Sequence, residues 1–182
     1  MIERIDFVAL DGFPAGLATE LAARTSRHVR LACRVSRASV APARSLSGRT
    51  QADADGALAM LEALPVPRGT VVMGLTARDI GSPLFAYFFG RARLHGRAGL
   101  VSTARLSPAF HGLPDDEAVT LRRAEIEVLH ELGHLLGLVH CHDFACLMHV
   151  TTDVEALDAR GTAFCPDCSR RLPGPLRSDE PS

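Results

Sequence analysis

Lysine is absent from this chain, so arginine supplies all 20 of its basic residues. We attribute this to a coding bias toward arginine and alanine rather than to function. The 21 acidic residues almost balance the arginines, and the formal net charge is −1. The basic excess that is typical of nucleic-acid-binding proteins is therefore missing. A run of about 18 apolar residues, which a membrane-spanning helix needs, is missing too, so we expect neither nucleic acid nor membranes as partners.

A secretory signal is also lacking, because the first ten residues include Glu3, Arg4 and Asp6. We therefore expect a cytoplasmic protein, and we expect no inhibitory pro-segment before the first predicted strand. Of the five cysteines, four lie within 28 residues near the C-terminus. Without an export signal, such clustering favours metal ligands over disulfides. The isolated Cys33 is predicted to be an ordinary buried thiol.

The length of 182 residues and the hydrophobic share of 47% predict one globular domain with a substantial core. We expect this domain to span residues 1–172, with a flexible tail over 173–182. Apolar and β-branched segments predict strands, and apolar residues at helical spacing predict the helices between them. The strands are expected at 5–9, 29–35 and 70–76, and the helices at 14–24 and 51–64. This alternation predicts a mostly parallel sheet with helices packed on it.

The second half of the chain predicts a different arrangement. A polar segment at 92–97 is followed by an apolar segment at 99–103, which is typical of an edge strand paired with an interior strand. After a loop, Asp115 or Asp116 is expected to cap a long helix over residues 117–138.

The strongest chemical signal is the string His130-Glu131-Leu132-Gly133-His134 inside an apolar helical stretch. A separation of four residues places His130 and His134 on one helical face, one turn apart. Two imidazoles so placed can bind one Zn²⁺ at Zn–N distances of about 2.0–2.1 Å. Glu131 lies beside the first histidine, where its carboxylate can take a proton from a metal-bound water and pass it to a leaving amine.

Gly137 and His140 extend this string to HELGHLLGLVH. A glycine three residues after His134 allows the chain to leave the helix with a positive φ, and a sharp turn can return His140 to the metal. Three histidine ligands leave the fourth zinc position open for water. This pattern resembles the metzincin superfamily of zinc metallopeptidases.

The residues after the helix make the resemblance more specific. Cys141, Cys146, Met148 and Cys165-Pro166-Asp167-Cys168 follow in an order that resembles the archaemetzincins over residues 128–172. Four thiolates suit a closed tetrahedral zinc site. Cys165 and Cys168 have the spacing of a common half-site, whereas Cys141 and Cys146 are unusually spaced, so joining the two pairs depends partly on the resemblance. Reduced core thiols or a redox pair are the alternatives.

The resemblance to archaemetzincins implies the roles of nine residues at two zinc sites and their surroundings. The catalytic zinc is expected on His130, His134 and His140, with Glu131 as the general base and acid for a zinc-bound water. The structural zinc is expected on Cys141, Cys146, Cys165 and Cys168. Met148 is expected in the Met-turn, a hydrophobic floor beneath the histidines.

The sequence pattern and the resemblance together predict an α/β, metzincin-like fold. We expect a twisted mixed sheet, mostly parallel with an antiparallel edge strand, packed on the active-site helix. A small zinc-stapled part is expected at residues 141–168, and the cleft is expected between the edge strand and the catalytic zinc. We expect a monomeric zinc metallopeptidase, either endopeptidase or aminopeptidase, that acts on peptides or proteins.

Two other functions stay open. The chain could be a catalytically silent zinc-binding interaction protein, although metal binding alone would not require Glu131. The four clustered cysteines could also form a nucleic-acid-binding zinc ribbon. The net charge of −1 argues against that reading, as does the lack of aromatic and basic clusters.

Several polar residues near these motifs have ambiguous roles. His142 and His149 flank predicted ligands, and we expect them to line the cleft. Arg93 and Arg97 could contact a substrate carboxylate, although solvated strand charges explain them more simply. Tyr87 is the only tyrosine, so none follows the predicted Met-turn. Oxyanion stabilisation is therefore expected from the zinc itself, from His149 or from an arginine.

Overall fold

The computed structural model of the protein describes residues 2–36, 45–46 and 48–172. The tail predicted at 173–182 lies outside the described residues. Within the described ranges, no helix combines the length and the apolar character that crossing a lipid bilayer requires.

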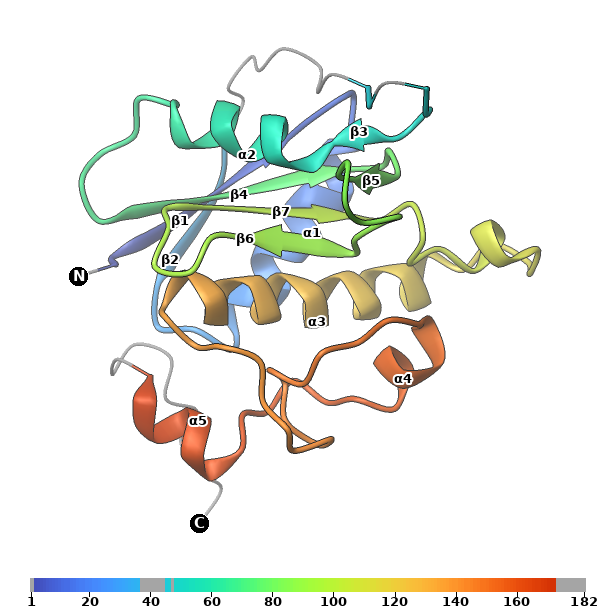
Figure 1. Ribbon diagram of the computed structural model, residues 1–182. Coiled ribbons are helices and arrows are strands. Elements are labelled where there is room, and N and C mark those ends of the chain that lie inside the picture. The colour runs from blue at the N-terminus through green and yellow to red at the C-terminus, as the bar shows by residue number, and fades with distance from the viewer. Residues whose placement is uncertain (1, 37–44, 47, 173–182) are drawn as a thin grey trace.

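A five-stranded sheet forms the centre of the fold (Figure 1). Its strands, in spatial order, are β2 (Ala32–Ser36), β1 (Arg4–Ala9), β4 (Thr70–Thr76), β7 (Ala98–Ser102) and β6 (Gly90–Ala92). The first four run parallel, and β6 pairs antiparallel with β7. All residues of β4 are buried, as expected of an interior strand in a parallel sheet covered on both faces. The predicted mostly parallel sheet with an antiparallel edge is confirmed.

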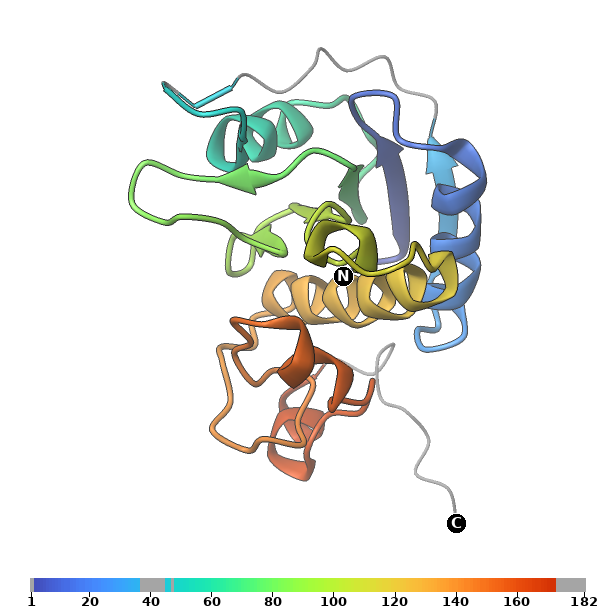
Figure 2. The ribbon, with the colours of Figure 1, turned by 90° about the vertical axis from the view of Figure 1, so that its right-hand side faces the viewer.

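Helices cover both faces of this sheet (Figures 1 and 2). One face packs against α1 (Ala15–Ser26) and α3 (Glu117–Leu135), and the other packs against α2 (Ala54–Glu62). Successive side chains of a strand point to opposite faces. Met73 of β4 therefore joins the core beneath α1 and α3, whereas the neighbouring Val72 joins the core beneath α2.

Aspartate caps fix where α2 and α3 begin. The Asp55 N–H donates a 3.1 Å hydrogen bond to Asp53 Oδ1, so α2 begins later than the predicted residue 51. The residues before it form β3 (Ala52–Asp53), which pairs in parallel with β5 (Ile80–Gly81), a short pair that the sequence did not predict. Asp116 caps α3, as predicted.

The edge strand lies nearer the N-terminus than the sequence predicts. Residues 92–97 were expected to form it, but only Ala92 of that segment belongs to β6. The Gly96 N–H donates to the Arg93 carbonyl oxygen at 2.8 Å, which closes a turn in which His95 has a φ of 56°. The His95 N–H also donates to the His134 carbonyl oxygen at 3.1 Å. The turn is thereby joined to the C-terminal end of α3.

The last part of the described chain lies on the side of α3 that faces away from the sheet (Figures 1 and 2). This last part contains α4 (Val154–Asp158) and α5 (Pro166–Arg171). At the other end of α3, the 3₁₀ turn η1 (Pro108–His111) precedes the helix. Arg123 of α3 forms a two-bond ion pair with Asp158, with N–O distances of 2.6 and 2.8 Å. The helix α3 is therefore enclosed between the sheet and the C-terminal part, which explains the burial of both its apolar and its polar residues.

Candidate metal centre and adjoining cavity

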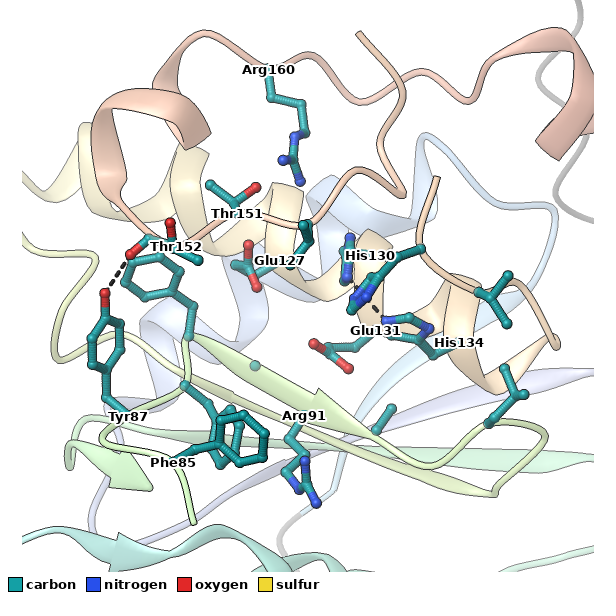
Figure 3. A pocket seen from close by; sticks show the side chains of 18 of the residues that line it. Phe85, Tyr87, Arg91, Glu127, His130, Glu131, His134, Thr151, Thr152 and Arg160 are labelled. Atoms are coloured by element: carbon teal, nitrogen blue, oxygen red, sulfur yellow. Dashed lines mark hydrogen bonds between the residues drawn. The ribbon is translucent and has the colours of Figure 1, made fainter. Parts of the chain in front are cut away.

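Three histidines converge at the C-terminal end of α3 (Figure 3). The possible ligand nitrogens of His130, His134 and His140 all lie within 4.8 Å of one another. His130 and His134 are one helical turn apart, and their Nε2 atoms are separated by 3.1 Å. Two nitrogens bound to one tetrahedral zinc at about 2.0–2.1 Å would lie about 3.3 Å apart. The spacing of these nitrogens therefore fits a shared zinc ion.

Hydrogen bonds to backbone carbonyls orient two of the imidazoles. Nδ1 of His130 lies 2.8 Å from the Leu147 oxygen, and Nδ1 of His134 lies 2.8 Å from the Leu138 oxygen. Because a carbonyl only accepts, each Nδ1 donates a proton and each Nε2 presents a lone pair. Burial lowers the pKa of His130 to about 3 and also lowers the pKa of His134 and His140. The rings are thus neutral at pH 7, and the two facing lone pairs fit a cation between them.

A glycine turn after α3 returns His140 to the other two histidines. Gly137 has a φ of 94°. The Gly137 N–H donates to the His134 oxygen and the Leu138 N–H donates to the Gly133 oxygen, both at 2.9 Å. These two bonds form a Schellman helix end, in which glycine is preferred. The sharp turn predicted at Gly137 is confirmed.

We expect Gly137→Ala to weaken zinc binding by the three histidines. The left-handed conformation costs a non-glycine residue about 1–2 kcal/mol, and a Cβ at this position would also overlap the His95 imidazole. Zinc affinity, measured by competition with a chromogenic chelator, should fall about tenfold or more. The matched control is Gly112→Ala. Gly112 also has a positive φ, of 76°, but a Cβ added there would meet no other atom within 4 Å. Equal zinc affinity in both variants would contradict this role for the turn.

Glu131 lies between the two helical histidines and faces the edge strand. It is 4% exposed, and its Oε2 atom has no hydrogen-bond partner among the described residues. A Cβ on Gly90 of β6 would lie 2.6 Å from Glu131 Oε1, so a glycine there leaves room for the carboxylate. Burial raises the pKa of Glu131 well above its ordinary value, the Glu127 carboxylate raises it further, and Arg91 opposes the rise. A raised pKa makes the Glu131 carboxylate a stronger base than an ordinary exposed carboxylate.

The four clustered cysteines converge as well. The Sγ atoms of Cys141, Cys146, Cys165 and Cys168 all lie within 4.8 Å of one another. Cys141 Sγ and Cys165 Sγ are 3.8 Å apart, and two thiolates on a tetrahedral zinc at about 2.3 Å would lie about 3.8 Å apart. The N–H groups of Cys165 and Met148 donate to Cys146 Sγ at 3.3 and 3.5 Å. All four are free of disulfides, so their donor set and spacing fit a closed zinc site.

The segment between the two clusters carries Met148, His142 and His149. Met148 is fully buried, and its sulfur packs against α3 where Gly133 leaves room for it. Nδ1 of His149 donates to the Cys141 oxygen at 2.9 Å, whereas His142 is exposed. Neither histidine lines the cavity beside the metal centre. The expectation that they line the cleft is wrong, because the segment turns them toward Cys141 and toward solvent.

A cavity of about 760 Å³ opens beside the three histidines and Glu131 (Figure 3). Its walls are residues 85–92, which include β6, one face of α3, and residues 150–152. Aromatic side chains supply much of the first wall, and the Tyr87 hydroxyl donates to the Thr152 carbonyl oxygen, which joins the first wall to the last. The predicted cleft between the edge strand and the histidines is therefore present.

The arginines around the edge strand have different positions. Arg91 lines the cavity and forms a 2.8 Å ion pair with Asp55. Arg93 and Arg97 are exposed and do not line the cavity. Arg93 lies 3.6 Å from the Glu62 carboxylate. The simpler interpretation of Arg93 and Arg97, as solvated charges, agrees with these positions.

Two buried polar residues of the cavity escaped the sequence analysis. Glu127 lies on α3 and Arg160 follows α4, and both line the cavity. Glu127 precedes His130 by three residues on the same helical face, so helical periodicity could have identified it. Arg160 belongs to no motif, and no sequence signal places it near the histidines.

Comparisons with known proteins find archaemetzincins among the proteins similar to this chain, and the chain spans about two thirds or less of the length of the curated relatives it matches. The archaemetzincin of Methanocaldococcus jannaschii is 37% identical over 113 residues, which cover 62% of this chain and 63% of that protein. The crystal structure of archaemetzincin from Archaeoglobus fulgidus has a TM-score of 0.78 at 26% identity, and the match covers 93% of this chain and 99% of that one. The archaemetzincin structure from Methanopyrus kandleri has a TM-score of 0.74 at 30% identity, covering 92% and 91%.

A model of one protein family matches most of the chain. Its match extends over residues 62–173. That range contains both metal-ligand clusters and Glu131, and it begins at the last residue of α2. The chain therefore belongs to peptidase family M54.

Proposed function

We propose that the protein is a zinc-dependent metallopeptidase whose catalytic zinc is held by His130, His134 and His140. The observation that carries this proposal is the convergence of three imidazoles beside buried Glu131, whose Oε2 atom has no hydrogen-bond partner among the described residues. Membership of peptidase family M54 supports the same activity. A second zinc, with a structural role, is assigned to the four clustered cysteines: Cys141, Cys146, Cys165 and Cys168.

When bound, a zinc ion with three histidine ligands supplies a Lewis acid with one position open to water and to the substrate carbonyl. Glu131 takes a proton from the attacking water through its unpartnered carboxylate. The same carboxyl group then donates this proton to the nitrogen of the leaving amine. The burial that raises the pKa of Glu131 favours retention of the proton between the two steps.

The substrate is proposed to bind as an extended strand along β6. This strand is the end member of the sheet, and all three of its residues line the cavity. Free backbone groups on a sheet edge can pair with an extended peptide. Such pairing would bring a peptide bond close to Glu131, which contacts Gly90 of the same strand.

The alternative, a catalytically silent zinc-binding protein, leaves Glu131 unexplained. Burial of a carboxylate costs free energy, and Glu131 belongs to neither ligand cluster. One chain supplies every candidate ligand and Glu131, so we propose a monomer that acts on peptides or proteins. None of the five cysteines forms a disulfide, which supports a cytoplasmic location, where thiols stay reduced.

A cleavage profile tests the proposed activity. The zinc-loaded protein is incubated with a peptide library, and the products are identified by mass spectrometry. We expect defined cuts, whose positions distinguish an endopeptidase from an aminopeptidase. His134→Ala, which lacks one ligand, is expected to yield no products. The proposal fails if the zinc-loaded protein cleaves nothing or if this variant cleaves equally well.

A further inference from the structure

A second pair of charged side chains lines the cavity beyond the histidines and Glu131 (Figure 3). Glu127 is 5% exposed and Arg160 is 4% exposed. Glu127 projects from α3, and the Arg160 guanidinium points toward that helix from the C-terminal part. Burial raises the pKa of Glu127 to about 7 and the Arg160 charge opposes this rise, so above this pH the two residues present opposite charges to one end of the cavity.

Neither side chain uses its full hydrogen-bonding capacity within the protein. Glu127 has no hydrogen bond and no ion pair within 4.0 Å among the described residues. Arg160 donates from Nη1 to the Leu147 oxygen at 3.4 Å, but its Nε atom is buried without a partner. Buried polar groups that lack partners cost free energy. Because both residues line the cavity, the Glu127 carboxyl group and the Nη end of the Arg160 guanidinium can bond to a ligand there.

The chemistry of this pair restricts the ligand. A carboxylate accepts hydrogen bonds and a guanidinium only donates them. A cationic ligand group would be attracted by Glu127 but repelled by Arg160. An anionic group would be attracted by Arg160 but repelled by Glu127. An apolar group would leave both charges unpartnered. A primary carboxamide offers an NH₂ to the carboxylate and a carbonyl oxygen to the guanidinium, so it satisfies both.

The position of the pair relates this ligand group to the reaction. Glu127 and His130 are three residues apart on one helix, and side chains at this spacing are neighbours. A side chain that reaches Glu127 and Arg160 therefore belongs to a substrate residue next to the bond that is cleaved. We propose that Glu127 and Arg160 form a specificity pocket that selects glutamine or asparagine at this position, an inference that rests on the proposed peptidase function.

Binding of peptide hydroxamates tests this proposal without requiring turnover. The set has one backbone and four side chains next to the hydroxamate: those of glutamine, glutamate, lysine and leucine. Dissociation constants are measured by calorimetry on the zinc-loaded protein. We expect the glutamine compound to bind about tenfold tighter than each of the others, since they leave at least one buried group unpartnered.

Glu127→Gln is the decisive variant because it keeps the shape of the side chain and removes its charge. An amide at residue 127 can donate to a carboxylate, so the preference should move from the glutamine compound to the glutamate compound. Arg160 is less suitable for substitution, because the Leu147 oxygen that it contacts also orients His130. Arg93→Gln is the matched control, since Arg93 lies outside the cavity, and the glutamine preference should persist in it.

The outcomes separate failure of the specificity pocket from failure of the proposed peptidase function. Equal binding of the four compounds, a preference for leucine, or an unchanged order in Glu127→Gln would overturn the specificity pocket and leave the peptidase function standing. If none of the hydroxamates binds the zinc-loaded protein, the catalytic metal site itself is wrong, and the specificity pocket falls with it.

Discussion

Glu131→Gln is expected to lower the rate of peptide hydrolysis by about 10²–10⁴-fold, the usual contribution of a general acid–base group, while the zinc content stays unchanged. Glu131 belongs to neither ligand cluster, so its substitution removes the proton acceptor without removing a metal ligand. Glutamine also keeps the close fit of residue 131 against Gly90. Turnover of a fluorogenic peptide and zinc per chain are measured on the same preparation.

The control for this prediction is His134→Ala, which should lose both zinc and hydrolysis. The contrast between the two variants separates a proton-transfer role from a ligand role. Hydrolysis at the wild-type rate in Glu131→Gln would rule out the proposed proton transfer. Loss of zinc in Glu131→Gln would make Glu131 a ligand or a support for one.

Cys168→Ser is expected to destabilise the protein by several kcal/mol, on the scale of structural zinc sites. Cys168 is 5% exposed, and its cluster joins α5 to the segment that follows His140. The residues from Cys141 to Cys168 include few buried apolar side chains, so packing alone gives this part little stability. Because Cys141 directly follows His140, loss of the structural zinc should also weaken the catalytic site.

Differential scanning calorimetry at equal zinc concentration measures this effect. Cys33→Ser is the matched control, because Cys33 is a partly buried thiol outside the cluster. The melting temperature of this variant should differ little from that of the wild-type protein. His130→Ala should lower the melting temperature less than Cys168→Ser does, since an open three-ligand site holds fewer segments together. If Cys168→Ser melts like wild type while His130→Ala unfolds, the structural zinc would have to be assigned to the histidines rather than to the cysteines.

Local relations explain what the sequence could predict of the site. His130, Glu131 and His134 lie on one helix, so a regular 3.6-residue repeat is enough to place them together. Gly137 marks the helix end by its conformational freedom, which brings His140 back. The close spacing of the cysteines along the chain similarly indicates a cluster.

Non-local contacts explain what the sequence could not predict. The position of the edge strand depends on a turn whose His95 N–H bonds to the distant His134 oxygen. Arg160 follows α4, which packs on α3 through the ion pair between Arg123 and Asp158 and through buried apolar side chains. Neither packing interaction has a signal in hydrophobic periodicity. The polar end of the cavity could therefore be found only from the fold.

The most direct test of the two-zinc account is zinc content and hydrolysis, measured before and after brief treatment with phenanthroline. Three histidines leave a coordination position open to the chelator, whereas four thiolates form a closed site. We expect zinc to fall from about two ions to about one per chain, hydrolysis to stop, and added zinc to restore both. Loss of both ions together, or continued hydrolysis after the first is removed, would contradict the account.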